Sequence, residues 1–233
     1  MSGGFRSRSK SGDPVDRGHK GQDKKRRYGT QKRAAARDNN RSTAAGQRHD
    51  RVRHADSLIE AARRSGVDVP RAVAFDVLRR VAADDAFANL TLPKALSANK
   101  LTGRDAAFAT ELTYGTLRTE GVLDAVIAQC ASRGLDAMAA EVLTALRLGT
   151  YQVLYTRVEA HAAVDTTVRL VEAADHEKAK GFANGIMRTI TRTPAKAWLD
   201  KLAPQGEIAG TAFKHSHPTW IAESFSRVLG LGE

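Results

Sequence analysis

Side chains suited to catalysis or metal binding are few in this sequence. Cys130 is the only cysteine. It follows Val126 and Ile127 at helical spacing, which favours a buried structural thiol over a nucleophile. His215 and His217 stand two residues apart in KHSHPTW, but no acid or cysteine accompanies them as protein zinc sites usually require. Because no phosphate-binding glycine loop and no HExxH pair occur either, the sequence predicts no catalytic residue and no metal site.

Basic and amide side chains offer a different chemistry, the binding of RNA phosphates and bases. Helical spacing in KAKGFANGIMRTITR allows four cations to share one solvent-facing side: Lys178, Lys180, Arg188 and Arg192. Asn184, in the same segment, is counted with them as an RNA-binding residue. Asn184 is also expected to bond a neighbouring backbone group. Arg118 and Arg147, on two other predicted helices, are expected to lie near one another and to extend this RNA-binding surface. The alternative is an ordinary solvated face whose cations pair with local acids such as Glu172 and Glu177.

The N-terminal stretch carries most of the excess positive charge. Residues 1–70 hold 18 of the 37 Lys and Arg but only 8 of the 26 Asp and Glu, so the net charge of +11 arises almost entirely there. Because bulky apolar residues are scarce, residues 1–69 are predicted to form a disordered basic tail. Its densest cationic run would pair with RNA phosphates and release counterions: Lys24, Lys25, Arg26 and Arg27. The alternative is a solubilising extension without a dedicated partner.

Three features of the sequence bear on the cellular compartment. No apolar run is long enough for a secretory signal or a membrane span. A mitochondrial transit peptide is disfavoured by Asp13, Asp16 and Asp23, and a single cysteine excludes an intrachain disulfide. We therefore expect a cytoplasmic protein with no membrane partner.

Helices are expected to position the basic surface. From Pro70 onward apolar residues recur at helical spacing, and neither an alternating strand pattern nor a hairpin signal is found. Residues 70–200 are therefore predicted to be one all-α domain, in which His161 starts or packs a helix. Residues 201–233 are predicted to be a linker with a short helix.

Glycines interrupt the predicted helices at several points. Gly121 is expected to separate two helices of the stretch that begins at Thr102. Gly181 and Gly185 lie one turn apart on one face, and Gly149 lies inside a core helix, where each costs about 1 kcal/mol relative to alanine. A helix tolerates that cost where the missing side chain lets another backbone approach. The sequence therefore predicts tight helix crossings at Gly149, Gly181 and Gly185.

Three motifs in a fixed order carry a resemblance to a known family. LRLGTYQVL, AHAAVDTTVRL and KGFANGIMR follow one another and resemble the NusB family of all-helical RNA-binding domains, over roughly residues 71–193. Within that family, DAAFATELTYGTLR, GFANGIMR and HSHPTWIAESF resemble the N-terminal domain of rRNA cytosine-C5 methyltransferases of the Sun (Fmu) type. Stand-alone NusB usually has an acidic residue where this chain has Arg188. The expected fold is therefore a NusB-like helical bundle preceded by the basic tail.

The resemblance also implies a component that this sequence does not contain. Methyltransferases of that type transfer a methyl group from S-adenosylmethionine by way of a cysteine in a doubly wound α/β domain. Such a domain would need on the order of 200 further residues, and Cys130 matches none of its motifs. We therefore expect neither catalysis nor cofactor binding from this chain by itself, and residues 201–233 would lead into the catalytic domain.

Three functions remain open at this point, in order of preference. The first is the RNA-binding N-terminal domain of a small-subunit rRNA (cytosine-C5) methyltransferase, which holds rRNA or another structured RNA for a catalytic domain in the same or a separate chain. The second is a stand-alone transcription antitermination factor that binds RNA together with a ribosomal protein. The third is a protein-interaction module that does not bind RNA.

Overall fold

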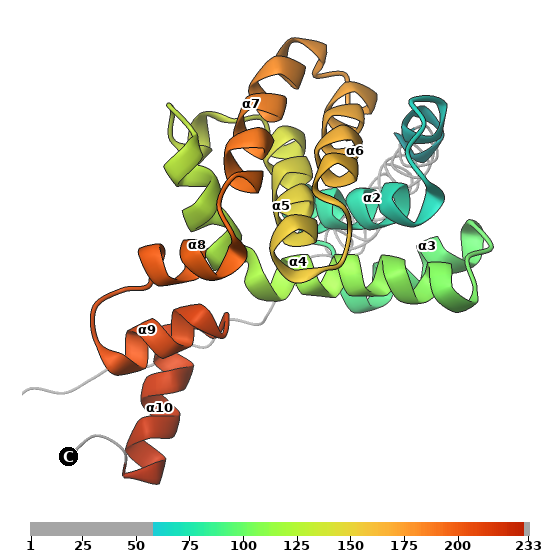
Figure 1. Cartoon of the computed structure of the whole chain (residues 1–233). Coiled ribbons are helices and arrows are strands. Elements are labelled where there is room, and N and C mark those ends of the chain that lie inside the picture. Colours follow the sequence, from blue (N-terminus) through green and yellow to red (C-terminus); the bar gives the residue numbers. More distant parts are fainter. Residues whose placement is uncertain (1–57, 231–233) are drawn as a thin grey trace, which may run out of the picture. The chain divides into compact units, whose positions relative to one another are not determined.

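The computed structural model describes residues 58–230, and every regular element within them is helical (Figure 1). The helices are α2 (Val69–Asp84), α3 (Ala88–Ala98), α4 (Gly103–Cys130), α5 (Ala140–Tyr155), α6 (Ala160–Ala173), α7 (Lys180–Thr191), α8 (Ala195–Leu202), α9 (Glu207–Lys214) and α10 (Thr219–Leu229). A helical segment over residues 58–64 precedes α2. Short 3-10 turns at Leu135–Ala137 and Glu177–Ala179 precede α5 and α7. The predicted all-α fold class is confirmed.

The folded domain begins before the predicted boundary at residue 70. The apolar side chains upstream of α2 are buried in the core: Leu58, Ile59, Ala62 and Val67. Asp68 then caps α2, because its Oδ1 accepts a hydrogen bond from the Arg71 backbone N–H at 3.1 Å. Residues 58–69 thus belong to the bundle rather than to the basic tail. The rest of the predicted tail, residues 1–57, lies outside the described residues.

Helix α4 runs without a break through Gly121, where the sequence predicted a boundary between two helices. Gly121 is exposed and a Cβ there would meet nothing within 4 Å, so the glycine has no packing role. Val122, Leu123, Val126 and Ile127 continue the helix and are buried in the core. Their burial outweighs the loss of about 1 kcal/mol in helix propensity at one glycine.

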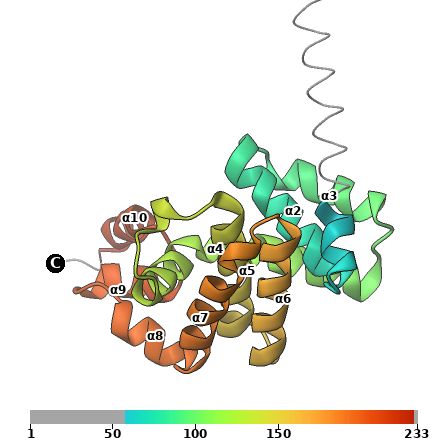
Figure 2. The same cartoon turned by 90° about the horizontal axis from the view of Figure 1, so that it is seen from above.

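Helix α5 occupies the centre of the bundle (Figures 1 and 2). It contacts α2, α4, α6 and α7, which explains why its apolar residues are not confined to one narrow stripe. Leu146 and Leu148 are fully buried, and so is Gln152, whose side-chain oxygen accepts a hydrogen bond from Arg71 Nε at 2.6 Å. This bond ties α5 to the first turn of α2.

Close helix approach occurs at Gly149 but not at Gly181 or Gly185. A Cβ on Gly149 would collide with Thr167 Oγ1 and lie 2.9 Å from Met187 Cε, so α6 and α7 both press against α5 there. A Cβ on Gly181 or Gly185 would meet nothing within 4 Å. The prediction of a tight crossing is therefore correct for α5 and wrong for α7, whose two glycines face open space.

The C-terminal helices attach to the bundle through apolar and polar contacts. Trp198 of α8 is buried and donates its Nε1–H to the Ile190 carbonyl at 3.1 Å. Asp200, near the end of α8, forms an ion pair with Lys214 of α9 at 2.8 Å. Tyr155 and Ser216 bring their hydroxyl oxygens within 3.4 Å. Residues 201–230 thus form two ordered helices after the end of α8.

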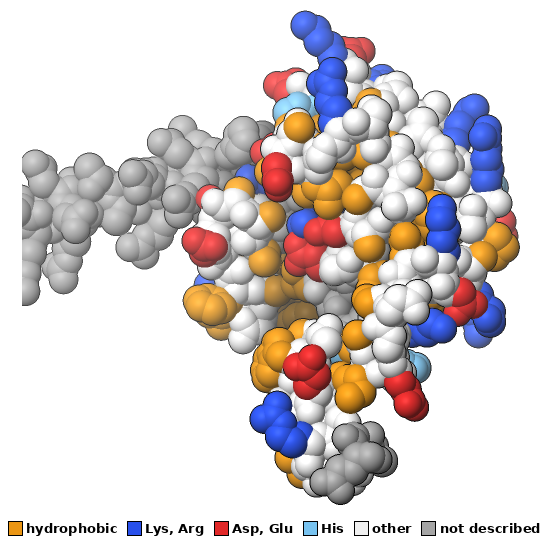
Figure 3. All heavy atoms as spheres, turned by 90° about the vertical axis from the view of Figure 1, so that its left-hand side faces the viewer, with side chains coloured by type: hydrophobic (Ala, Val, Ile, Leu, Met, Phe, Trp, Pro, Cys, Tyr) orange, Lys and Arg blue, Asp and Glu red, His pale blue; other side chains and the backbone are white. Residues whose placement is uncertain are grey.

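Helix α10 exposes an apolar surface. Figure 3 shows hydrophobic side chains in the lower part of the molecule, where α9 and α10 lie. Those of α10 are 64–82% exposed: Trp220, Phe225, Val228 and Leu229. Among residues 58–230, no helix is both long enough and apolar enough to cross a membrane.

Candidate nucleic-acid interface

Helix α7 separates buried apolar residues from exposed polar ones. Its buried side consists of Ala183, Ile186, Met187 and Ile190. Beside this buried side Lys180, Asn184 and Arg188 recur every four residues, so they form one stripe along the helix; Lys180 and Asn184 are partly exposed and Arg188 is exposed. The basic side predicted from helical spacing also included Lys178 and Arg192, which do not belong to this stripe.

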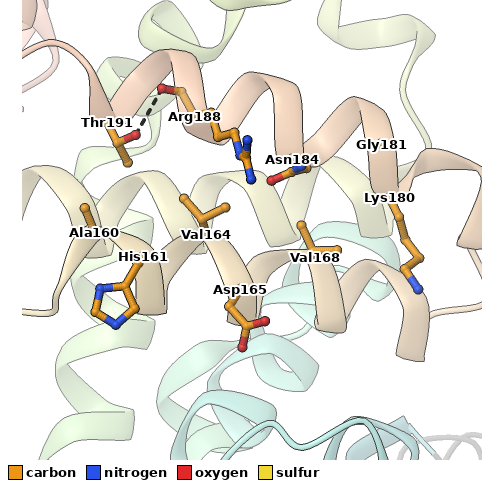
Figure 4. A pocket seen from close by; sticks show the side chains of 10 residues that line it. All are labelled: Ala160, His161, Val164, Asp165, Val168, Lys180, Gly181, Asn184, Arg188 and Thr191. Atoms are coloured by element: carbon orange, nitrogen blue, oxygen red, sulfur yellow. Dashed lines mark hydrogen bonds between the residues drawn. The ribbon is translucent and has the colours of Figure 1, made fainter.

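The stripe borders an open groove between α6 and α7, of about 570 Å³ (Figure 4). From α6 the groove is lined by Ala160, His161, Val164, Asp165 and Val168, and from α7 by Lys180, Gly181, Asn184, Arg188 and Thr191. In Figure 4 the side chains of Asn184 and Arg188 extend from α7 toward α6. Gly181 contributes no side chain, which leaves the groove open between Lys180 and Asn184.

Two of the charged groups that line the groove form local ion pairs. Lys180 Nζ lies 2.9 Å from Glu172, and Asp165 lies 2.7 Å from Arg169. Arg188 is exposed, and its side chain forms no ion pair or hydrogen bond with any of residues 58–230. The groove therefore presents one uncommitted guanidinium group. The alternative of a face paired with local acids holds for Lys180 but not for Arg188.

Asn184 lines the groove and does not have the partner predicted for it. No hydrogen bond of its side chain to a group within residues 58–230 is present. Since the side chain is half-exposed, its amide can bond solvent or a ligand. The predicted tie to a neighbouring backbone group is therefore wrong for the described part of the chain.

Arg147 is committed to an internal ion-pair network. Its Nε and Nη2 bond Asp124 at 2.7 Å each, and its Nη1 lies 2.5 Å from Glu120. Burial by itself would lower the pKa of Arg147, but the bond to Asp124 and the two nearby carboxylates raise it overall. Two acids thus already neutralise this cation, which removes Arg147 from the predicted RNA-binding surface.

The other predicted basic residues are spread over different surfaces. Arg118 is exposed on α4 and lines a separate cleft, whereas Arg147 lines a small pocket with Thr116, so the two do not share a site. Lys178 lies in the turn before α7 and faces a third hollow beside Phe182. Arg192 is exposed at the end of α7 but does not line the groove. Lys24, Lys25, Arg26 and Arg27 lie outside the described residues.

Sequence reasoning missed the contribution of α6 to the groove. Val164, Asp165 and Val168 gave no signal of their own, because only the packing of α6 on α7 brings them beside Arg188. His161 does lie in the first turn of α6, but it is exposed and lines the groove rather than packing.

The residues first considered for catalysis have surroundings unsuited to it. Cys130 is half-buried against the core, and burial raises the pKa of its thiol, which disfavours the reactive thiolate. Within the part of the chain that the structure describes, no cluster of three or more His, Cys, Asp or Glu side chains could hold a metal ion.

Comparison with known proteins identifies relatives of the helical domain. A Mycobacterium tuberculosis protein, described provisionally as a methyltransferase, is 50% identical over 171 residues, covering 72% of this chain and 37% of that protein. The ribosomal RNA small subunit methyltransferase B of Pseudomonas putida is 32% identical over 155 residues, covering 66% of this chain and 34% of that protein. This chain thus spans little more than a third of the length of these curated relatives.

The solved structure of T. maritima NusB shares the fold. It aligns with a TM-score of 0.51 at 19% identity, over 56% of this chain and 94% of the other. The NusB family model matches residues 68–192, which is more than half of the sequence. The helical bundle is therefore a NusB domain related to rRNA methyltransferases, and the chain belongs to the NusB family.

Proposed function

We propose that this chain is the RNA-binding part of a small-subunit rRNA (cytosine-C5) methyltransferase. Relatives described as ribosomal RNA small subunit methyltransferase B share about a third of their length with it. The remaining two thirds of those proteins would contain an S-adenosylmethionine-dependent catalytic domain. Its own task would be to hold rRNA in position for methyl transfer.

The observation that carries RNA binding is the uncommitted Arg188 in the open groove between α6 and α7. Arginine binds phosphates through a planar fork of N–H donors, and an amide such as that of Asn184 can bond base edges. Both groups line the same groove. Val164 and Val168 provide an apolar floor against which a base or ribose can pack.

Replacing Arg188 by alanine in the full chain tests this function. We expect the affinity for rRNA fragments to fall about tenfold and the slope of log affinity against log salt to decrease by about one. Arg104→Ala is the matched control, because Arg104 is also an exposed helical arginine but lines none of the hollows described above. Equal losses of RNA affinity in the two variants would show that Arg188 contributes only general positive charge and that the groove is not a specific RNA site.

The basic tail is tested separately by changing Lys24, Lys25, Arg26 and Arg27 to alanine in the full chain. If the tail only pairs with phosphates, this variant should bind all RNA sequences more weakly to the same extent. The slope of log affinity against log salt should then decrease by up to about four. Sequence-selective binding that survives this change would favour an antitermination-like factor over a methyltransferase domain. If neither the intact chain nor any variant bound RNA, the proposed function would be refuted and a protein-interaction module favoured.

The proposal of a separate catalytic domain draws support from α10. Four large apolar side chains on this helix are 64–82% exposed, and exposed apolar patches commonly mark interaction surfaces. The chain alone is expected to transfer no methyl group from labelled S-adenosylmethionine to small-subunit rRNA. Measurable transfer by the purified chain would refute this division of labour.

A further inference from the structure

A second basic hollow lies apart from the groove between α6 and α7. It is a cleft of about 650 Å³ between the α4–α5 side of the bundle and the connection from α9 to α10, and this volume is within the range typical of ligand sites. Its polar lining comes from three separate parts of the chain: Arg118 and Thr119 from α4, Tyr155 from α5, and Lys214 at the end of α9 with His215, Ser216 and His217 of the α9–α10 connection.

The electrostatics of this cleft differ from those of the groove beside α7. Arg118, Lys214, His215 and His217 line it, whereas no acidic residue of the described chain does. Lys214 is paired with Asp200 at 2.8 Å outside the lining, but Arg118 forms no ion pair with a described carboxylate. The cleft therefore presents N–H donors and the positive charge of Arg118, which has no carboxylate partner among the described residues, whereas the charge of Lys214 is offset by Asp200.

An aromatic ring stands beside these donors. Tyr155 stacks on Tyr151 with ring centroids 5.5 Å apart and an interplanar angle of 21°, so the rest of its ring is available to line the cleft. Its hydroxyl oxygen lies 3.4 Å from Ser216 Oγ, which holds the α9–α10 connection against α5. Tyr151 is itself fixed by a short hydrogen bond to Glu111. The ring is thus held by packing on one side and by a polar contact at its edge.

Ser216 shapes the loop that supplies the histidines. Its φ of 57° places it in the left-handed region, so the chain turns sharply between His215 and His217 and both imidazoles line the same cleft. Backbone bonds from His217 N–H to the Ala212 carbonyl at 2.8 Å and from Ser216 N–H to the Phe213 carbonyl at 3.0 Å secure this turn. The loop is therefore an ordered part of the cleft wall.

We infer that this cleft binds a short segment of single-stranded RNA, with a base on Tyr155 and the adjoining phosphates on Arg118, His215 and His217. Aromatic stacking together with cationic contacts to the backbone is how proteins hold unpaired nucleotides. This inference rests on the proposed RNA-binding function but assigns a site that is separate from the groove containing Arg188. The two sites together would give the bound RNA a path from α7 to the start of α10.

Two substitutions at one position separate the ring of Tyr155 from its hydroxyl. Tyr155→Leu in the full chain should weaken binding of a single-stranded oligouridylate about 5- to 100-fold, whereas Tyr155→Phe keeps the ring and should stay within about twofold of the unmodified chain. Arg118→Gln should lower the salt slope by about one, and Arg104→Ala is again the matched control. Unchanged binding in both Tyr155→Leu and Arg118→Gln would overturn the inference.

Crosslinking of the unmodified chain supplies a readout that does not depend on the folding of a variant. Ultraviolet irradiation with thiouridine-labelled RNA should attach the label to peptides that contain Tyr155 or His215. Labels confined to α7 and the tail would overturn the cleft site while leaving RNA binding intact, and no label anywhere would count against the proposed function itself. Saturation by uridine monophosphate with no tighter binding of the oligouridylate would overturn the inference in favour of a mononucleotide site.

Discussion

Replacing Gly149 by alanine is expected to destabilise the bundle, although alanine favours helices. The added Cβ would collide with Thr167 Oγ1 and lie 2.9 Å from Met187 Cε. Met187 can move its flexible end. Thr167 cannot move as easily, because it is fully buried and its hydroxyl donates to the Ala163 carbonyl at 2.7 Å. Overpacking of this kind costs about 1–3 kcal/mol, against a gain of about 1 kcal/mol in helix propensity.

Gly185→Ala provides the matched comparison for this substitution. Gly185 also lies inside a helix, but a Cβ there would meet nothing within 4 Å, so this variant should be stabilised by up to about 1 kcal/mol. Subtracting the two variants cancels the propensity gain and leaves a difference of about 1–3 kcal/mol in the free energy of unfolding. Urea denaturation followed by circular dichroism, with unchanged m-values, measures it. If Gly149→Ala proved as stable as Gly185→Ala, the close approach of α6 and α7 to α5 would be refuted.

Three further outcomes follow from buried and paired charges. Burial and the hydrogen bond to Glu111 raise the pKa of Tyr151 to about 12. A pH titration followed by tyrosinate absorbance should therefore show one late-titrating tyrosine, and Tyr151→Phe should remove it. The contribution of this shift to the free energy of unfolding is present below the ordinary tyrosine pKa of about 10 and is lost as pH rises toward 12. Asp76 is fully buried and pairs with Arg80 at 2.8 Å and with Arg79 at 3.3 Å, so Asp76→Ala should cost about 3–5 kcal/mol in urea denaturation. A cost below about 1 kcal/mol would contradict the pairing. Hydrogen bonds from Lys196 and Lys214 lower the pKa of Asp200 to about 2. The stability that these bonds contribute is therefore present above the ordinary aspartate pKa and is lost as pH falls toward 2. Because Lys214 belongs to α9, Asp200→Asn should speed hydrogen exchange in α9 but not in α5.

The division of basic residues among several surfaces bears on how RNA could be bound. Arg188 and Arg118 are both exposed, yet they line different hollows, while Arg147 serves α4–α5 packing through Asp124. Counting cations along the sequence therefore overstates the size of any one site. The structure places Arg188 and Arg118 in two separate hollows and not on the continuous basic face that helical spacing suggested.

Patterns that are local in sequence were sufficient to predict the helical class and the polar side of α7. A spacing of four residues puts Lys180, Asn184 and Arg188 on one face whatever the helix packs against, and the three ordered motifs identified a NusB-like bundle. The same local view could not separate Gly149 from Gly185, because both are helical glycines and only the neighbouring helices determine whether a Cβ would fit.

Tertiary structure alone decided which charges are free and where the domain starts. Arg147 meets Asp124 across 23 positions of sequence, and no spacing rule within one helix contains that pairing. The burial of Leu58 has a similar cause, because it depends on apolar surface supplied by helices distant in sequence. Helical periodicity is set by the chain's own backbone, whereas burial and ion pairing depend on contacts between segments remote in sequence.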